Sequence, residues 1–319
     1  MALSALHRAT PVDGNPTSFT QDSLVSSLIA SSIESLRSEL QDESGPSKYA
    51  LVLTIRTLAV CEIHSGKSDA YSWRVHVEGA KALLQTVAAA QGTASPDDPE
   101  LQWLVDTWYG SIESLMALTT TRGLTKSQLD RFAPRALIRE AHPDHRYLDT
   151  YTAYSTDLNV AFQEIGAAAW ERRRINEFGD QATLLSNKDL DEESEWLEFS
   201  VRAMIGKPVF RPSDLQVLSH REIREYQACD EAYQETALIH IPRRVRQLPR
   251  SDIRVQEHVK RTLRRASQIQ PSDGLSPWVM LTTPVFAAGC EALANDRDVV
   301  RGLLRRMFQL LRIPTSNDR

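Results

Sequence analysis

The sequence predicts an all-α protein built from packed antiparallel helices, with no significant sheet. Three observations favour this class. Apolar residues recur every three or four positions along most of the chain, alternating strand-like patterns of useful length are absent, and Gly (13) and Pro (15) are sparse among 319 residues. Hydrophobic residues make up 41% and charged residues 25%, which excludes a mainly disordered chain because much apolar surface is available for burial.

The first half of the chain contains four amphipathic stripes, each with its apolar residues on one helical face. They cover residues 24–40, 51–59, 73–87 and 101–116. Residues 44–46 and 92–99 contain Gly and Pro between stripes, and their composition is typical of loops. Four helices are therefore expected in this half.

The second half repeats the pattern less regularly. Helical stripes cover residues 158–169, 196–205, 223–241 and 300–311. We expect roughly ten or more helices in all, and the lack of a strict repeat period argues against a regular solenoid. They should form a single domain over residues 1–319, which the segment 119–145 could divide into two subdomains.

Charge and cysteine content exclude several classes of protein. The net charge is −5, whereas domains that bind nucleic acid usually run basic. Cys61, Cys229 and Cys290 lie far apart, which gives neither a disulfide framework nor a zinc site. No apolar run approaches the roughly 18 residues of a membrane span, and the N-terminus shows no secretion signal. We expect no membrane partner.

Two short motifs could form a binding site, but neither is convincing. Gly66-Lys67-Ser68 resembles the end of a phosphate-binding loop, yet Cys61 stands where that loop needs a second glycine, so a helix C-cap is the better interpretation. His142 and His145 flank Asp144, and a polar surface turn is favoured there over a metal site because no further ligand presents itself. We assign no catalytic, cofactor-binding or metal-binding residue and expect no cofactor.

A basic segment covers residues 243–265, with nine Arg or Lys against two acids. Such a segment could meet phosphates or an acidic partner. Pro242 and Pro249 should interrupt any continuous basic helix, with a bend or an end at Ile241. We therefore predict a structural role, in which several arginines pair with carboxylates of the chain itself. The candidate partners are the acids of residues 189–198, Glu231 and Glu235.

Three ordered segments resemble the C-terminal regulatory domain of fungal zinc-cluster transcription factors. They are residues 62–84, residues 233–245, and Trp278 with residues 284–297. The resemblance is scattered over nearly the whole chain and names a domain, not a catalytic site. The residues that we single out as its structural motif are Trp73, His76, Gly79, Ala80, Glu235, Arg243, Trp278, Pro284, Gly289 and Glu291.

These motif residues suggest scaffold roles. Gly79 and Ala80 should let a neighbouring helix approach closely beside Trp73. A glycine inside an apolar helix costs about 1 kcal/mol relative to alanine, so Gly289 is expected at a packing contact. Glu291 should pair with an arginine, and Arg297 is the nearest candidate along the chain.

The resemblance implies a nuclear regulatory domain that responds to a ligand or a partner. Its partners would be the transcription machinery or co-regulator proteins. The six tryptophans could also line a pocket between helices for a small apolar ligand. Family members usually carry an N-terminal six-cysteine zinc module that binds DNA, and this sequence has none, so DNA would be reached only through a module absent from this chain. The alternative is a stand-alone helical enzyme, of a non-metal cyclase type, or a metabolite-binding protein of fungal secondary metabolism on the same scaffold.

Overall fold

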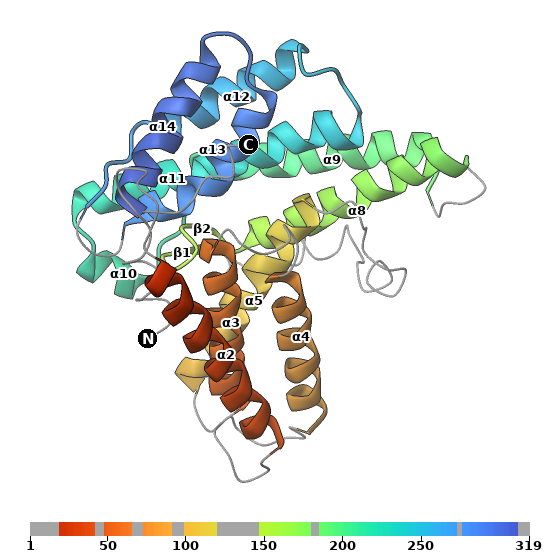
Figure 1. Cartoon of the computed structure of the whole chain (residues 1–319). Coiled ribbons are helices and arrows are strands. Elements are labelled where there is room, and N and C mark those ends of the chain that lie inside the picture. Colours follow the sequence, from red (N-terminus) through yellow and green to blue (C-terminus); the bar gives the residue numbers. More distant parts are fainter. Residues whose placement is uncertain are drawn as a thin grey trace. The chain divides into compact units, whose positions relative to one another are not determined.

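The computed structural model describes residues 19–41, 48–65, 73–90, 99–119, 147–179, 185–272 and 276–311. These residues are almost entirely helical, with one two-stranded hairpin among them (Figure 1). The all-α prediction is confirmed. Contacts between residues divide the chain into two compact units, residues 1–109 with 306–319, and residues 110–305. Apart from Thr119, the predicted divider at 119–145 lies outside the described residues, so that division stays a prediction.

The first unit is a set of packed helices. It contains α2 (Phe19–Gln41), α3 (Lys48–Ser65), α4 (Trp73–Ala90) and the first part of α5 (Pro99–Thr119). Helix α3 packs against both α2 and α4. Leu51, Val52, Ile55, Leu58 and Ala59 of α3 are buried, as are Val77 and Ala80 of α4. The stripes of α3 and α4 therefore contribute to the core of this unit, whereas Leu24 and Leu40 of the first stripe are exposed.

The second unit contains the rest of α5 and most of the later helices. Its elements are β1 (Leu148–Asp149), β2 (Tyr154–Ser155), α8 (Asp157–Phe178), α9 (Asn187–Met204), α10 (Pro212–Val217), α11 (His220–His240), η3 (Ile241–Val245), α12 (Ile253–Ala266), η4 (Pro277–Leu281), α13 (Thr282–Glu291) and the first part of α14 (Asp296–Leu311), whose residues from Arg306 onwards belong to the first unit. Helices α8 and α9 lie side by side, and α11 packs against α12, α13 and α9 (Figure 1).

Two helices of this unit begin at capping boxes that the sequence carries. At the start of α9, the side chain of Ser186 accepts a hydrogen bond from the backbone N–H of Asp189, and the carboxylate of Asp189 accepts one from the backbone N–H of Ser186. Ser219 and Glu222 do the same for α11. Each box satisfies backbone N–H groups that have no partner within the first helical turn, which fixes where α9 and α11 begin.

The small hairpin is tied to α11 by a buried carboxylate. Asp230 accepts hydrogen bonds from the backbone N–H of Ser155 (2.7 Å) and from its hydroxyl (2.9 Å). Gln234 donates a third, at 2.8 Å. The sequence patterns do not predict this hairpin, because two-residue strands leave no period to detect.

Helix α11 does not simply end at its proline. Because Pro242 has no N–H to donate, α-helical bonding ends at His240, and the chain continues as the π turn η3, closed by the N–H of Arg246 on the carbonyl of Ile241 (3.1 Å). The predicted end near Ile241 is correct, and the wider turn was not predicted. Such turns are rare and occur often at functional sites.

Candidate functional site

Three arginines leave the π turn in different directions. The first, Arg243, donates from Nε to Oε2 of Glu291 at 2.7 Å, which ties the turn to α13. It also donates to the carbonyl of Leu248. On the other side, Arg172 of α8 donates from Nε to the carbonyl of Val245 at 2.9 Å. The π turn therefore joins α8 and α13 through arginine side chains.

The second arginine, Arg244, caps the end of α5. It donates to the carbonyls of Leu118 and Ala117 (3.4 Å for Ala117), which lie in the last helical turn where carbonyls lack an intrahelical partner. Burial, together with the charge of Arg173, lowers the pKa of Arg244 to about 10, so the guanidinium stays charged at neutral pH. Burial and Arg244 lower the pKa of the neighbouring His240 to about 3, and this ring is neutral.

The third arginine, Arg246, reaches α9. Its Nε donates to the hydroxyl of Ser194 at 2.7 Å, and its Nη1 lies 2.9 Å from Oε2 of Glu198. The other oxygen of Glu198 accepts from Nε (3.0 Å) and Nη2 (2.8 Å) of Arg202. Burial acts to raise the pKa of Glu198, but the hydrogen bond from Arg202 and the charges of Arg246 and Arg202 lower it below its ordinary value.

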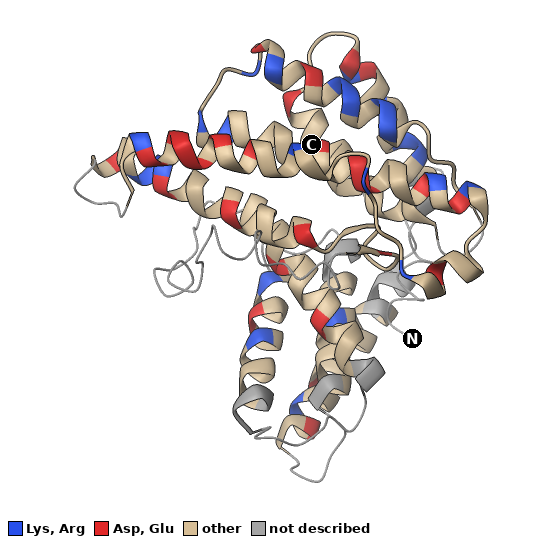
Figure 2. Ribbon diagram, turned by 180° about the vertical axis from the view of Figure 1, so that it is seen from behind, with Lys and Arg blue, Asp and Glu red and all other residues tan. Residues whose placement is uncertain are grey.

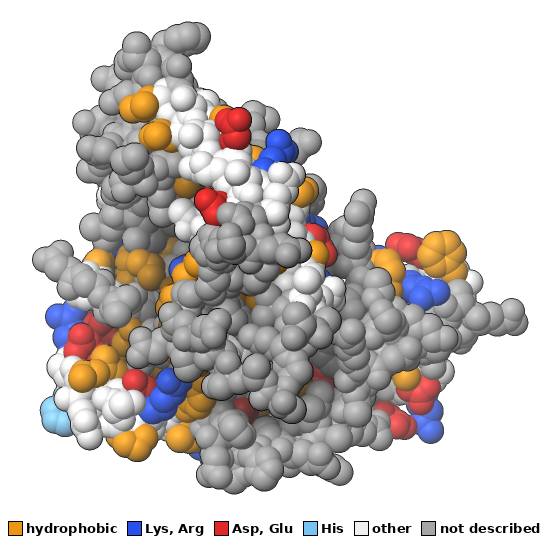
Figure 3. Space-filling view, turned by 90° about the horizontal axis from the view of Figure 1, so that it is seen from below, with side chains coloured by type: hydrophobic (Ala, Val, Ile, Leu, Met, Phe, Trp, Pro, Cys, Tyr) orange, Lys and Arg blue, Asp and Glu red, His pale blue; other side chains and the backbone are white. Residues whose placement is uncertain are grey.

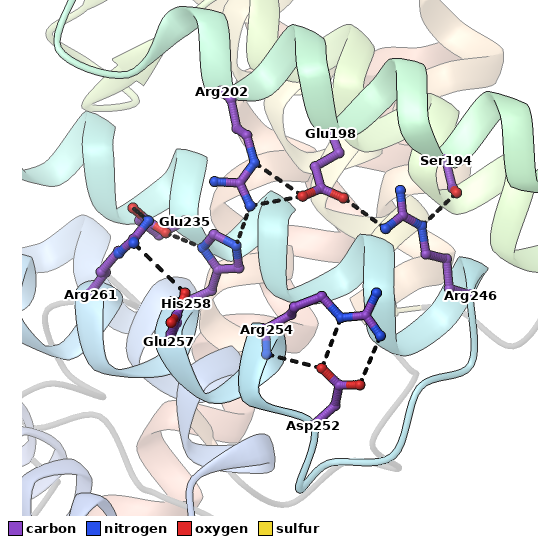
Figure 4. Close-up of polar contacts among 10 residues, drawn as sticks. All are labelled: Ser194, Glu198, Arg202, Glu235, Arg246, Asp252, Arg254, Glu257, His258 and Arg261. Carbon is purple, nitrogen blue, oxygen red and sulfur yellow. Dashed lines mark hydrogen bonds and ion pairs between the residues drawn. The ribbon is translucent and has the colours of Figure 1, made fainter.

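Arg202 continues the chain of contacts into a buried histidine (Figure 4). Its Nη2 lies 3.1 Å from Nε2 of His258 on α12, and Nδ1 of His258 lies 2.5 Å from Oε2 of Glu235 on α11. The exposed fraction of His258 is 2% and that of Glu235 is 5%. Because a guanidinium can only donate, Nε2 must accept and Nδ1–H donates to Glu235.

We call this set of residues the polar network: Ser194, Glu198, Arg202, Glu235, Arg246 and His258. It spans α9, α11, η3 and α12 (Figure 4). Inside a protein such bonds are strong when every group is satisfied and costly when one is missing. The network therefore fixes the position of α9 relative to α11 and α12 more specifically than apolar contacts alone would.

The basic segment 243–265 is paired as the sequence predicted. Five of its nine cations make ion pairs with carboxylates of the chain, including the expected partners Glu198, Glu231 and Glu235. The five are Arg243, Arg246, Arg254, Arg261 and Arg265. Basic and acidic side chains both occur along the helices of the second unit (Figure 2). On the face drawn in Figure 3, the described residues show no large area of one sign.

Three of the motif residues chosen from the sequence belong to this region. They are Glu235, which binds His258, and the pair Arg243 and Glu291. The expected partner of Glu291 was wrong: Nε of Arg297 donates instead to the carbonyl of Ala292, at 3.0 Å. Proximity along the chain favoured Arg297, whereas the π turn brings Arg243, which is 48 positions away, to α13.

The other motif residues are scaffold positions. Trp278 and Pro284 are buried. A Cβ on Gly289 would lie 2.9 Å from Cγ1 of Val300, which is the close contact that the sequence predicted. In the first unit, Ala80 is fully buried.

The expected close approach at Gly79 is wrong. A Cβ on Gly79 would meet nothing within 4 Å among the described residues, so this glycine is not needed for helix packing. Trp73 and His76 are only half-buried, and the guanidinium of Arg74 lies 5.6 Å from the centre of the Trp73 ring. The N-terminal part of α4 is thus less deeply packed than the sequence suggested.

Sequence reasoning missed His258 and Arg202. One signal could have found the first: His258 lies on the apolar face of α12, among Val255, Val259 and Leu263. A polar residue on such a face needs a buried partner. Nothing in the sequence indicated which helix supplies it.

Glu164 of α8 is a buried carboxyl. It is 3% exposed, and neither of its oxygens makes a hydrogen bond with the described residues. Burial, together with the charge of Glu193, raises the pKa of Glu164 to about 9. This side chain therefore carries a proton at neutral pH. A perturbed buried acid of this kind is a recognised marker of functional sites.

Among the described residues, no group of three or more His, Cys, Asp or Glu could hold a metal ion. Gly66-Lys67-Ser68 and the pair His142 and His145 lie outside the described residues. None of the described helices is both long enough and apolar enough to cross a membrane.

The described residues form an all-α structure, and in its second unit the polar network joins α9, α11 and α12. The family model of the fungal specific transcription factor domain matches residues 1–317, so the chain belongs to this family. Membership supports a role in the regulation of transcription and favours that role over catalysis. No curated protein and no solved structure matches the chain.

Proposed function

We propose that this chain is the regulatory domain of a fungal transcription regulator and that it responds to a ligand or to a partner protein. Family membership supports the regulatory role. The polar network is the observation that carries the response. Its bonds join α9 to α11 and α12 through the buried pair Glu235 and His258 and through Arg202, whose side chain is 43% exposed. A displacement of α9 would break them.

Incomplete pairing within this network is costly. A buried charge without its partner loses several kcal/mol, so the network has few intermediate arrangements. A ligand or partner that binds better to one arrangement of α9 than to another would shift the population between them. The shift would change the surface that the domain presents to co-regulators or to the transcription machinery.

The chain would act in the nucleus, where its partners are. DNA would be reached through a module outside this sequence, because the charge of the chain is −5 and its basic segment is paired internally. A small apolar ligand remains one candidate effector, and a co-regulator protein is the other.

A tethering experiment tests this proposal. The chain is fused to an unrelated DNA-binding domain in a fungal host, and transcription of a reporter is compared with that given by the DNA-binding domain alone. We expect a clear change in reporter output. Glu235→Gln should alter that output because it weakens the bond to His258, whereas Glu257→Gln should not, because Glu257 is exposed on α12. Equal output from all fusions, at equal protein levels, would contradict the proposal.

The alternative of a metabolite-binding protein or enzyme has one supporting observation, the protonated carboxyl of Glu164. A neutral buried acid can donate a hydrogen bond to a ligand or act as a general acid. In that case Glu164→Gln would abolish binding of the metabolite while the reporter output of the tethered chain stayed unchanged. The regulatory proposal expects no such separation.

A further inference from the structure

Two arginines precede an exposed serine at the end of α12. The sequence there is Arg264-Arg265-Ala266-Ser267, and Ser267 is the only serine or threonine of the 319 residues with arginine at both the second and the third preceding positions. A protein that selects this pattern needs acidic groups spaced to pair with two guanidinium groups. We propose that Ser267 is a phosphorylation site for a serine/threonine kinase with such an acidic substrate groove.

The structure leaves the recognition elements accessible. Helix α12 ends at Ala266, and Ser267 is its exposed C-cap residue. Arg264 is exposed and makes no hydrogen bond or ion pair with the described residues, so a kinase can bind it without breaking a contact. Arg265 is partly exposed and is paired with Glu231 of α11 at 2.5 Å.

Reaction requires the last turn to open locally. The Ser267 hydroxyl donates to the carbonyl of Leu263 (2.8 Å), as does its backbone N–H (3.0 Å). Each bond contributes roughly 0.5–1.5 kcal/mol net, and terminal helical turns open at low cost. Ala266 and Ile269 are fully buried, which limits the opening to this turn and leaves the rest of α12 in place.

The chemistry is an ordinary phosphoryl transfer from Mg-ATP. The Ser267 oxygen forms a bond to the γ-phosphorus, while the bond from that phosphorus to the bridging oxygen breaks and ADP leaves. The hydroxyl proton passes to a carboxylate base of the kinase. The product carries close to two negative charges at neutral pH.

The added phosphate would compete for Arg265. A negative group at a helix C-terminus is disfavoured by the helix dipole, so the phosphate must be stabilised by side chains, and Arg264 and Arg265 are the nearest cations in sequence. Recruiting Arg265 removes the partner of Glu231, whose pKa burial already raises. Phosphorylation would thus loosen the contact between α11 and α12, close to the polar network.

The test uses the purified chain, Mg-ATP and the catalytic subunit of cyclic-AMP-dependent protein kinase, with peptide mapping by mass spectrometry. We expect one phosphate at Ser267 in the native chain and none there in Ser267→Ala. Arg264→Ala should reduce the rate by about tenfold or more because one guanidinium contact is lost. Lys260→Ala is the matched control: it removes an exposed cation of the same helix, seven positions before the acceptor, and should leave the rate unchanged.

A peptide of residues 259–272 separates sequence recognition from accessibility. Phosphorylation of both the peptide and the native chain is the expected result. Phosphorylation of the peptide without the chain would show that the fold hides Ser267 and would overturn the proposal, as would a native chain modified only at other serines. Hydrogen–deuterium exchange at residues 260–266 should rise in the phosphorylated chain, and unchanged exchange would contradict the predicted loss of the Arg265–Glu231 pair.

Discussion

Replacing Glu164 with glutamine should make the protein more stable than wild type, by an amount that grows as the pH rises. The native carboxyl keeps its proton up to a pKa of about 9, whereas an ordinary glutamate loses it near 4.5. Between these two values the native state binds more protons than the unfolded state, so the free energy of unfolding falls as the pH increases. Glutamine has nearly the same shape and no charge, and it removes this dependence.

The size of the effect follows from the two pKa values. Each pH unit between them is worth about 1.4 kcal/mol. The carboxyl therefore lowers the free energy of unfolding by about 3 kcal/mol between its ordinary pKa and pH 7, and by an upper limit of about 6 kcal/mol by pH 9. Wild type and Glu164→Gln should have similar stability near pH 5 and diverge steadily above it.

Urea unfolding at several pH values between 5 and 9 measures this directly. Glu192→Gln is the control, because that carboxylate of α9 is exposed and should leave the pH dependence as in wild type. A Glu164→Gln protein whose stability followed the same pH profile as wild type would show that Glu164 is not a buried protonated acid. In that case burial would not raise the pKa of this carboxyl.

Three further predictions concern the scaffold and the network. Glu235→Ala should lower the free energy of unfolding by about 1–3 kcal/mol, because it leaves Nδ1–H of His258 unpaired; urea titration with exposed Glu257→Ala as control checks this. Gly289→Ala should lower the melting temperature, at a cost of about 1–3 kcal/mol from overpacking against a neighbouring valine, whereas Gly302→Ala, with open space around its Cβ, should raise it. The stability that Glu198 contributes should be fully present above its ordinary pKa of 4.5 and vanish as the pH falls through its lowered pKa; the difference in unfolding free energy between wild type and Glu198→Gln should therefore be largest at neutral pH, and a constant difference would exclude the ion pairs.

Sequence periodicity predicted most of the long helices, but it did not predict α10, α12, α13 or the hairpin. Helices α9, α11 and α14 follow from stripes of apolar residues, because each turn of a helix repeats the same signal. Strands β1 and β2 hold only two residues each, and their position depends on Asp230, which lies 75 positions from Ser155. No local pattern encodes a contact at that distance.

The candidate site, like the fold, could be predicted only in part. The charges of the basic segment and of its acidic partners could be counted, so pairing within the chain was predictable. The specific pairs were not, as Glu291 shows: the π turn, which depends on how α11 passes its proline, directs Arg243 towards it. His258 was overlooked because its role depends on Arg202 and Glu235 from two other helices.

Hydrogen–deuterium exchange of α9 is the most direct test that the polar network holds this helix against α11 and α12. In Glu235→Gln the weakened bond to His258 should be transmitted through Arg202, so that residues 198–204 exchange faster than in wild type. The exposed control Glu257→Gln should match wild type. Unchanged protection of residues 198–204 in Glu235→Gln would contradict the coupling on which the proposed response to a ligand or partner depends.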